Sequence, residues 1–352
     1  PDLILVTLDT VRADLTTPYG SERDTTPALA ALAKRGVLFE HAYAIGSTTQ
    51  RALAPIVTGK PLSAIKRSAD DWPTIHDDND TLAEQLSEAG YATGAVVSFT
   101  WLRPERGFAQ GFNYFEDKPW QTRHPEREYT GDVALSAAKN VYDKLAKSDK
   151  PLFLWVHLFD AHKRYVDHAD IDYGDGQRDR YLAEVDRQLG GLVEHVDAGP
   201  RADKTVYLVH GSHGEAFNEH DVIEHGREVY NETIWVPLVV AGAGVKPRKV
   251  ARAVSTLDIA PTLLSLANAP LNDSYGVSLR DALGGSELAR DPVLSYARHR
   301  VAVVDWPFKL VARTRKGSGA WLLLFDLSAD PGETKDVAGA HNDVLRRLGD
   351  VR

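Results

Sequence analysis

The chain has 352 residues, of which 43% are apolar and 26% charged, with 41 Lys and Arg against 50 Asp and Glu. This composition excludes a disordered or collagen-like protein, and the net charge of −9 argues against a nucleic-acid-binding surface. No apolar run approaches the roughly 20 residues of a membrane span. There is no cysteine, which excludes disulfides and thiolate chemistry.

Strand and helix signals alternate along the chain. A continuous apolar run over residues 2–8 predicts a strand buried on both faces. Thr25, Thr26 and Pro27 then supply a cap and a first-turn proline for a helix that ends at Gly36. The pattern continues with strands predicted over 95–97, 152–156, 205–209 and 236–241. Helices are predicted after an N-cap at Asp80, over 129–145 and over 181–193.

This alternation predicts an α/β fold with a mostly parallel central sheet flanked by helices on both faces. After about Leu266 the pattern changes to turns and short strands, over 308–312 and 321–325. We therefore expect a large domain over residues 1–265 and a small C-terminal α+β subdomain over residues 266–352.

Polar residues cluster where three of the predicted strands end. In open α/β sheets, ligands bind beyond the carboxyl ends of the strands, so these residues are expected to share one edge. A carboxylate together with several imidazoles is a plausible divalent-metal constellation. The residues are Asp9 and Thr10 after the first strand, His157, Asp160 and His162 at the next, and His210, Ser212 and His213 at the third.

Taken in chain order, these motifs resemble the sulfatase family of the alkaline phosphatase superfamily, over nearly the whole chain. Leu8-Asp9-Thr10 resembles the family's opening metal-binding strand end, residues 157–162 its histidine loop, and His213-Gly-Glu215 its second metal strand. The resemblance implies an alkaline-phosphatase-like fold and a metal-dependent hydrolase of sulfate or phosphate esters. In that chemistry a hydroxyl nucleophile forms a covalent intermediate, which is then discharged.

The expected nucleophile loop departs from the family pattern. Sulfatases carry Cys or Ser in a Cys/Ser-x-Pro-x-Arg motif, followed nine and ten residues on by Thr-Gly. Counting back nine from Thr58 gives Thr49, whereas counting back four from Arg51 gives Ser47, and neither register supplies the proline. We favour Thr49, because a helix sets the spacing to Thr58. The missing proline argues against conversion to formylglycine.

The resemblance assigns the remaining roles. The family reads Asp-His-Gly where this chain has Ser212-His213-Gly214, so one anionic ligand is lost and cation binding is expected to weaken. The cofactor is expected to be calcium, magnesium, manganese or zinc. His157, inside a strand, is expected to be structural. The catalytic candidates are Thr49, His162, His225 and Arg51, and the metal-ligand candidates are Asp9, Thr49, Ser212 and His213.

Two other functions stay open at this point. One is a catalytically impaired member that binds a sulfated or phosphorylated ligand, and the other is a phosphoethanolamine- or phosphoglycerol-type transferase. The expected partner is a small-molecule, glycan or lipid ester, and no nucleic acid. The resemblance favours a periplasmic or extracytoplasmic location, with membrane anchoring only through a segment that this chain does not include.

Overall fold

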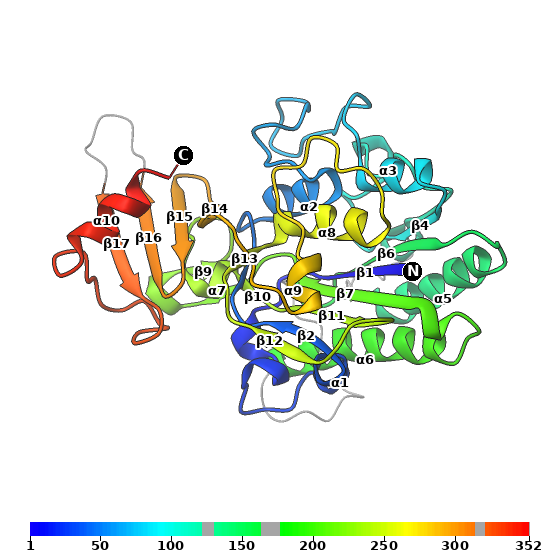
Figure 1. Cartoon of the computed structure of the whole chain (residues 1–352), viewed down its shortest axis with the longest axis horizontal. Coiled ribbons are helices and arrows are strands. Elements are labelled where there is room, and N and C mark those ends of the chain that lie inside the picture. Colours follow the sequence, from blue (N-terminus) through cyan, green and yellow to red (C-terminus); the bar gives the residue numbers. More distant parts are fainter. Residues whose placement is uncertain (122–129, 163–176, 314–320, 352) are drawn as a thin grey trace.

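The protein is built around one large sheet. Its computed structural model describes residues 1–121, 130–162, 177–313 and 321–351. The eight strands of the sheet run in the order β12-β2-β11-β7-β1-β6-β4-β5 (Figure 1). Only β11 (Leu238–Gly242) pairs antiparallel with its neighbours, so the predicted mostly parallel sheet is confirmed. The others are β1 (Asp2–Leu8), β2 (Gly36–Phe39), β4 (Ala92–Val96), β5 (Tyr114–Glu116), β6 (Leu152–Leu158), β7 (Thr205–Gly211) and β12 (Arg248–Val250).

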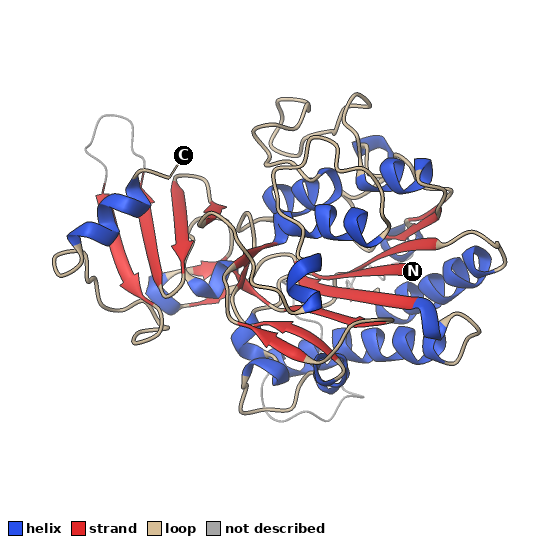
Figure 2. Ribbon diagram, in the orientation of Figure 1, coloured by secondary structure: helices blue, strands red, loops and turns tan. Residues whose placement is uncertain are grey.

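Helices cover both faces of this sheet (Figure 2). One face packs against α1 (Pro27–Lys34), α5 (Gly131–Ala146) and α6 (Gln177–Asp197), and the other against α2 (Thr49–Thr58), α3 (Leu82–Glu88) and α8 (Ile259–Leu266). Alternate residues of β1 enter the two cores, with Leu3 and Leu5 on the α2 side and Ile4 and Val6 on the α5 side. This explains why the strand reads as an unbroken apolar run.

Two boundaries differ from the expected ones for identifiable reasons. The N-cap of α3 is Thr81 instead of Asp80, because Thr81 Oγ1 accepts from Glu84 N at 3.2 Å while Glu84 Oε2 accepts from Thr81 N at 2.9 Å. The run predicted over 236–241 is interrupted at Pro237, which lacks the N–H that a ladder needs. Its first part becomes β10 (Trp235–Val236), which pairs with β3 (Ala42–Tyr43) outside the large sheet.

The C-terminal part forms a second, antiparallel sheet. Its strands are β14 (Val293–Tyr296), β15 (Arg300–Asp305), β16 (Phe308–Arg313) and β17 (Trp321–Asp326), and α10 (Asn342–Gly349) packs on it. Leu279, Leu283 and Leu288, which precede this sheet, are buried in the core of the large sheet. The boundary at residues 265 and 266 stays a prediction, and this packing favours a later one.

Across the described ranges, no helix has the length and apolar character needed to cross a bilayer.

Candidate active site

The carboxyl ends of three neighbouring strands meet at the site. Thr7 of β1 is in register with His157 of β6 on one side and His210 of β7 on the other. Asp9 follows β1 directly, and Ser212 follows β7. Ser212 Oγ donates a short hydrogen bond to Asp9 Oδ1, so the structure brings these two predicted residues into contact.

Asp9 is completely buried and lies among histidines. Its Oδ2 is 3.6 Å from His157 Nε2, and its Oδ1 is 3.5 Å from His213 Nε2. Burial raises the pKa of Asp9, but the imidazoles of His157, His213 and His162 outweigh burial and hold that pKa well below its usual range. Asp9 therefore favours the ionised form. The sequence places His157 at the same edge of the sheet as Asp9 but assigns it a structural role, whereas the structure brings its ring against the Asp9 carboxylate.

Thr49 begins α2 and contacts a histidine. Thr48 caps the helix by accepting from Arg51 N at 3.3 Å, which leaves Thr49 as the first helical residue. Thr49 Oγ1 lies 3.2 Å from His213 Nε2. His213 Nδ1 lies 2.9 Å from the Gly214 carbonyl, which can only accept, so Nδ1 carries the hydrogen. Nε2 therefore holds the lone pair, and the Thr49 hydroxyl donates to it.

Ser47, the alternative nucleophile, has no such partner. It is fully buried, and within the described residues its Oγ makes no hydrogen bond. The spacing from Thr49 to Thr58 is that of α2 itself, which ends at Gly59 in a left-handed conformation. The contact with His213 and the spacing to Thr58 both favour Thr49 over Ser47 as the candidate nucleophile.

His225 and His162 complete a cluster of imidazoles around His213. The ring centroids of His213 and His225 are 4.4 Å apart, and those of His225 and His162 are 5.2 Å apart. Burial lowers the pKa of His213 to about 3. Burial also lowers the pKa of His225, but the carboxylate of Glu215, 3.0 Å from His225 Nδ1, more than compensates and raises it above its ordinary value. The cluster thus joins a neutral imidazole to one that favours the charged form.

Arg51 is the predicted residue that the structure separates from this cluster. It follows Thr49 by two positions on α2, about 200° around the helix axis, so the two side chains leave on different sides. Its guanidinium is half-buried, and burial together with the charges of Arg67 and Arg298 lowers its pKa. A role for Arg51 on the transferring group stays a prediction.

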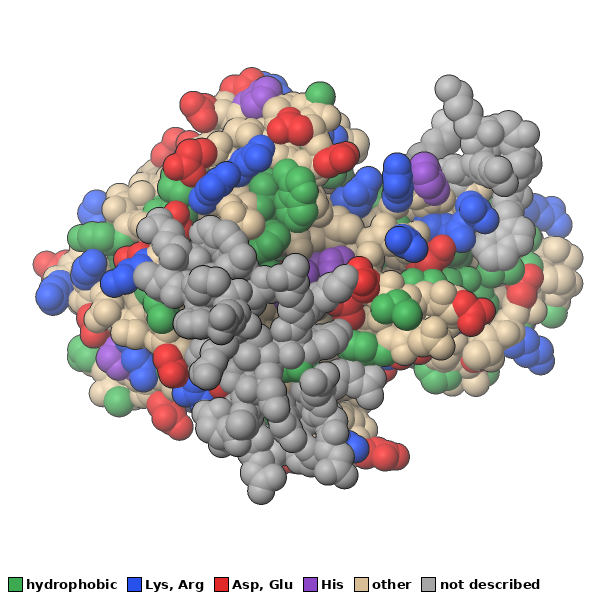
Figure 3. Space-filling model, turned by 180° about the vertical axis from the view of Figure 1, so that it is seen from behind, with side chains coloured by type: hydrophobic (Ala, Val, Ile, Leu, Met, Phe, Trp, Pro, Cys, Tyr) green, Lys and Arg blue, Asp and Glu red, His purple; other side chains and the backbone are tan. Residues whose placement is uncertain are grey.

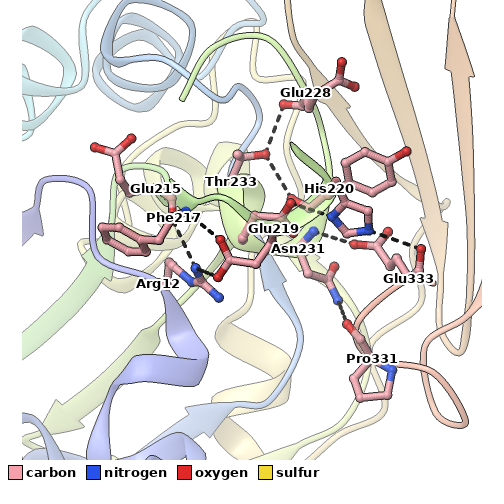
Figure 4. Close-up of polar contacts among 12 residues, drawn as sticks. Arg12, Glu215, Phe217, Glu219, His220, Glu228, Asn231, Thr233, Pro331 and Glu333 are labelled. Carbon is pink, nitrogen blue, oxygen red and sulfur yellow. Dashed lines mark hydrogen bonds and ion pairs between the residues drawn. The ribbon is translucent and has the colours of Figure 1, made fainter. Parts of the chain in front are cut away.

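The loop that carries His225 is anchored from two sides (Figure 4). On one side Arg12 binds the Glu215 carbonyl at 3.1 Å and the Glu219 carboxylate at 2.7 Å. On the other, His220 binds Glu232 at 2.8 Å and the Glu333 carbonyl at 3.2 Å. Since Glu333 follows the last strand of the C-terminal sheet, both parts of the molecule hold this loop.

This loop is also strained. Four of its non-glycine residues have a positive φ, a conformation that costs each of them on the order of 1 kcal/mol. They are Asn218, His220, Asp221 and Glu224, with φ values of 89°, 51°, 57° and 72°. The anchors at Arg12 and Glu333 therefore maintain a backbone path that the loop sequence alone does not favour.

The donors gathered here do not make a complete metal site. Among the described residues, no group of three or more Asp, Glu, His or Cys side chains is arranged to hold an ion. Asp9 is one anionic donor, and the Ser212 hydroxyl already occupies its Oδ1. Only Asp9 Oδ2, buried without a hydrogen-bond partner among the described residues, favours a cation. Hard divalent cations bind several oxygen ligands, commonly including more than one carboxylate.

The sheet order and the residues at its carboxyl edge define an alkaline-phosphatase-like α/β protein. The solved structure of phosphonate monoester hydrolase of Agrobacterium radiobacter shares this fold, with a TM-score of 0.76, 20% identity, and coverage of 99% of this chain and 94% of that chain.

The family follows from the sequence match. The model of the family Sulfatase matches residues 1–269, and the chain belongs to the sulfatase family. Choline-sulfatase of Rhizobium meliloti (strain 1021) is 22% identical over 429 residues, covering 96% of this chain and 82% of the relative. N-acetylgalactosamine-6-O-sulfatase of Bacteroides thetaiotaomicron is 23% identical over 470 residues, covering 100% of this chain and 92% of the relative. The expected family and fold are therefore confirmed.

Proposed function

We propose that the protein hydrolyses sulfate esters through a covalent intermediate on Thr49. The observation that carries the proposal is the 3.2 Å contact between Thr49 Oγ1 and His213 Nε2, with the imidazole tautomer able to accept the hydroxyl proton. A hydroxyl is a weak nucleophile until a neighbouring base removes its proton. Membership of a family of ester hydrolases supports the same reaction class.

In the first half of the reaction, Thr49 Oγ attacks the sulfur and the bond from sulfur to the leaving oxygen breaks. The Thr49 proton moves to His213 Nε2, and the resulting imidazolium is stabilised by Asp9, 3.5 Å away. The leaving oxygen takes a proton from His225, whose pKa Glu215 raises. The products are the alcohol and sulfated Thr49.

In the second half, water attacks the sulfur and Thr49 Oγ leaves. His213 returns its proton to Thr49, and His225 accepts the proton that the water loses. Hydrogen sulfate is released and both histidines regain their starting states. The backbone N–H groups at the start of α2 support both halves, because a helix N-terminus stabilises negative charge.

The type of ester and the role of a metal belong to this proposal. A phosphate or phosphonate ester is the second candidate, because the neighbour of the same fold is a phosphonate monoester hydrolase. The family is generally metal-dependent, whereas this chain's dependence on calcium, magnesium, manganese or zinc remains a prediction. The names of the relatives favour a small-molecule or glycan ester as substrate. A periplasmic or extracytoplasmic location stays an expectation.

The test compares Thr49→Ala with Ser47→Ala in assays of aryl sulfate, phosphate monoester and phosphate diester hydrolysis, with and without each metal. Thr49→Ala is expected to lower kcat at least about 10³-fold, because it removes the nucleophile. Ser47→Ala is the matched control and is expected to retain activity. Metal content of each protein is measured alongside.

The outcomes separate the alternatives. Activity that survives Thr49→Ala but not Ser47→Ala would move the nucleophile to Ser47. Ligand binding by a folded wild-type protein that turns over no ester would favour the impaired, ligand-binding member of the family. Transfer to an added alcohol in preference to water would favour the transferase.

A further inference from the structure

A basic cluster lies near the N-terminus of α2, on a different side of the helix from Thr49, and has no part in the chemistry above. Arg51 lies in the first turn of α2, Arg67 in the segment between α2 and α3, and Arg298 in the turn between β14 and β15. None of the three forms an ion pair with any other described residue. Arg300 shows the contrast, since it binds both oxygens of Glu228, at 2.6 and 2.8 Å. The three arginines therefore carry positive charge that no direct ion pair with a described residue neutralises.

Backbone pairing brings two of these arginines together. Gly46, just before the nucleophile segment, forms a bridge with Tyr296, and Ser47 N donates to the Tyr296 carbonyl at 3.1 Å. A Cβ on Gly46 would collide with Cβ and the backbone of Arg51, so the first turn of α2 at Arg51 packs directly against the glycine. Arg298 follows Tyr296 by two residues. The turn that carries Arg298 therefore lies close to the segment against which Arg51 packs.

Arg67 is held in place without being neutralised. Its Nε donates to the Leu62 carbonyl and its Nη1 to the Ser68 carbonyl, both at 3.2 Å. The charges of Arg67 and Arg298 both act on Arg51, and among the acting groups only Asp71 opposes them. Three like charges are thus gathered from three separate segments. Their mutual repulsion is relieved when an anion binds between them.

We infer that Arg51, Arg67 and Arg298 form a subsite for a second anionic group, a carboxylate or a sulfate, carried by the leaving-group half of the ester. The inference rests on the proposed ester hydrolysis and names its substrate class. Figure 3 shows Lys and Arg side chains gathered on the C-terminal side of a hollow in which a histidine is visible. An alcohol leaving toward that side meets the arginines.

The first experiment measures discrimination between two aryl esters. The substrates are 4-nitrophenyl sulfate and the same ester with a ring carboxylate, and the readout is the ratio of their kcat/KM values at low ionic strength. We expect the wild type to favour the carboxylated ester about tenfold or more, and added salt to reduce the preference. Arg298→Gln and Arg67→Gln are each expected to bring the ratio to within about twofold of unity.

A matched control and a binding measurement complete the test. Arg346→Gln removes an exposed arginine of α10 with the same change of charge and is expected to keep the wild-type ratio. Independently of turnover, titration calorimetry compares benzene-1,3-disulfonate with benzenesulfonate on the full chain. The disulfonate is expected to bind more tightly to the wild type and to lose that advantage in Arg298→Gln.

These outcomes distinguish the subsite from the activity. Turnover with equal use of both esters by the wild type would overturn the subsite and leave the hydrolase. Selective disulfonate binding that depends on Arg298, with no turnover of any ester, would keep the subsite and overturn the hydrolase. Discrimination that survives in folded Arg298→Gln and Arg67→Gln proteins would also overturn the subsite. Exchanging the carboxylate for a ring sulfate tells which anion is preferred.

Discussion

Ser212 is the residue that most changes the chemistry expected at this edge of the sheet. Its hydroxyl donates to Asp9 Oδ1, so it occupies one of the two carboxylate oxygens that could bind a cation. A carboxylate at this position would add an anionic donor and remove that competing hydrogen bond. Without a cation, the same carboxylate would repel Asp9 in a buried site.

Ser212→Asp is accordingly expected to raise affinity for manganese or calcium at least about tenfold and to make the melting temperature depend on that metal. Calorimetric titration gives the affinity, and melting with and without chelator gives the dependence. Ser47→Ala is the control, because Ser47 is equally buried but contacts neither Asp9 nor His213. Unchanged metal affinity in Ser212→Asp would show that position 212 does not face a cation site.

At the scale of elements, α1 is capped by a neighbouring helix. Its N-cap residue Thr26 makes no side-chain cap. Instead Asp186 of α6 accepts from Ala28 N at 2.7 Å and from Leu29 N at 2.9 Å. Burial nevertheless raises the pKa of Asp186 to about 7, so protonation of this carboxyl is linked to folding.

The raised pKa of Asp186 determines whether its contribution to stability grows or falls with pH. The folded-state pKa lies above the unfolded value of 3.8, so the stabilising contribution is complete below pH 3.8 and is lost as the pH rises to about 7. Asp186→Asn imitates the protonated form at every pH. Its free energy of unfolding relative to wild type is expected to rise by as much as about 4 kcal/mol between pH 4 and 7.5, measured by urea denaturation. A flat difference would mean that the two N–H donors keep Asp186 ionised throughout.

The elements also show what sequence patterns can and cannot predict. An apolar run predicts β1 because burial on both faces favours apolar residues at most positions, and the spacing to Thr58 points to Thr49 because α2 fills that interval. The sequence offers two adjacent capping residues before α3, Asp80 and Thr81. Only the reciprocal hydrogen bond between Thr81 and Glu84 shows that Thr81 is the N-cap. The surroundings of Arg51 come from segments near residues 67 and 298, and no local pattern reports such distant contacts.

For the whole molecule, a buried ion pair of the C-terminal part, with Asn231 as a further partner, attaches that part to the segment after His225. Lys309 of β16 is fully buried and lies 2.8 Å from Glu333 Oε1 and 3.1 Å from Asn231 Oδ1, at the start of the short helix α7 (Asn231–Ile234). Glu333 Oε2 in turn accepts from Asn231 N at 2.5 Å. The C-terminal sheet is thereby attached to the segment that follows His225.

Lys309→Met is expected to cost about 3–5 kcal/mol of unfolding free energy, because it leaves the Glu333 carboxylate buried without its partner. Calorimetric melting gives the loss, and kcat/KM is expected to fall as the His225 loop loosens. Lys335→Met, at an exposed position nearby, is the control and is expected to change both by little. The double variant Lys309→Met, Glu333→Met should regain part of the stability. A double variant no more stable than Lys309→Met would contradict this assignment.

The strained loop around His220 affects the point during synthesis at which the protein becomes catalytically active. During synthesis the chain emerges from its N-terminus, so Thr49, His213 and His225 leave the ribosome well before Lys309 and Glu333. Until those later residues arrive, nothing on the C-terminal side opposes relaxation of the left-handed backbone at residues 218–224. A nascent chain that already contains all the proposed catalytic residues is therefore expected to be inactive, and competence should appear only when the last sheet has docked.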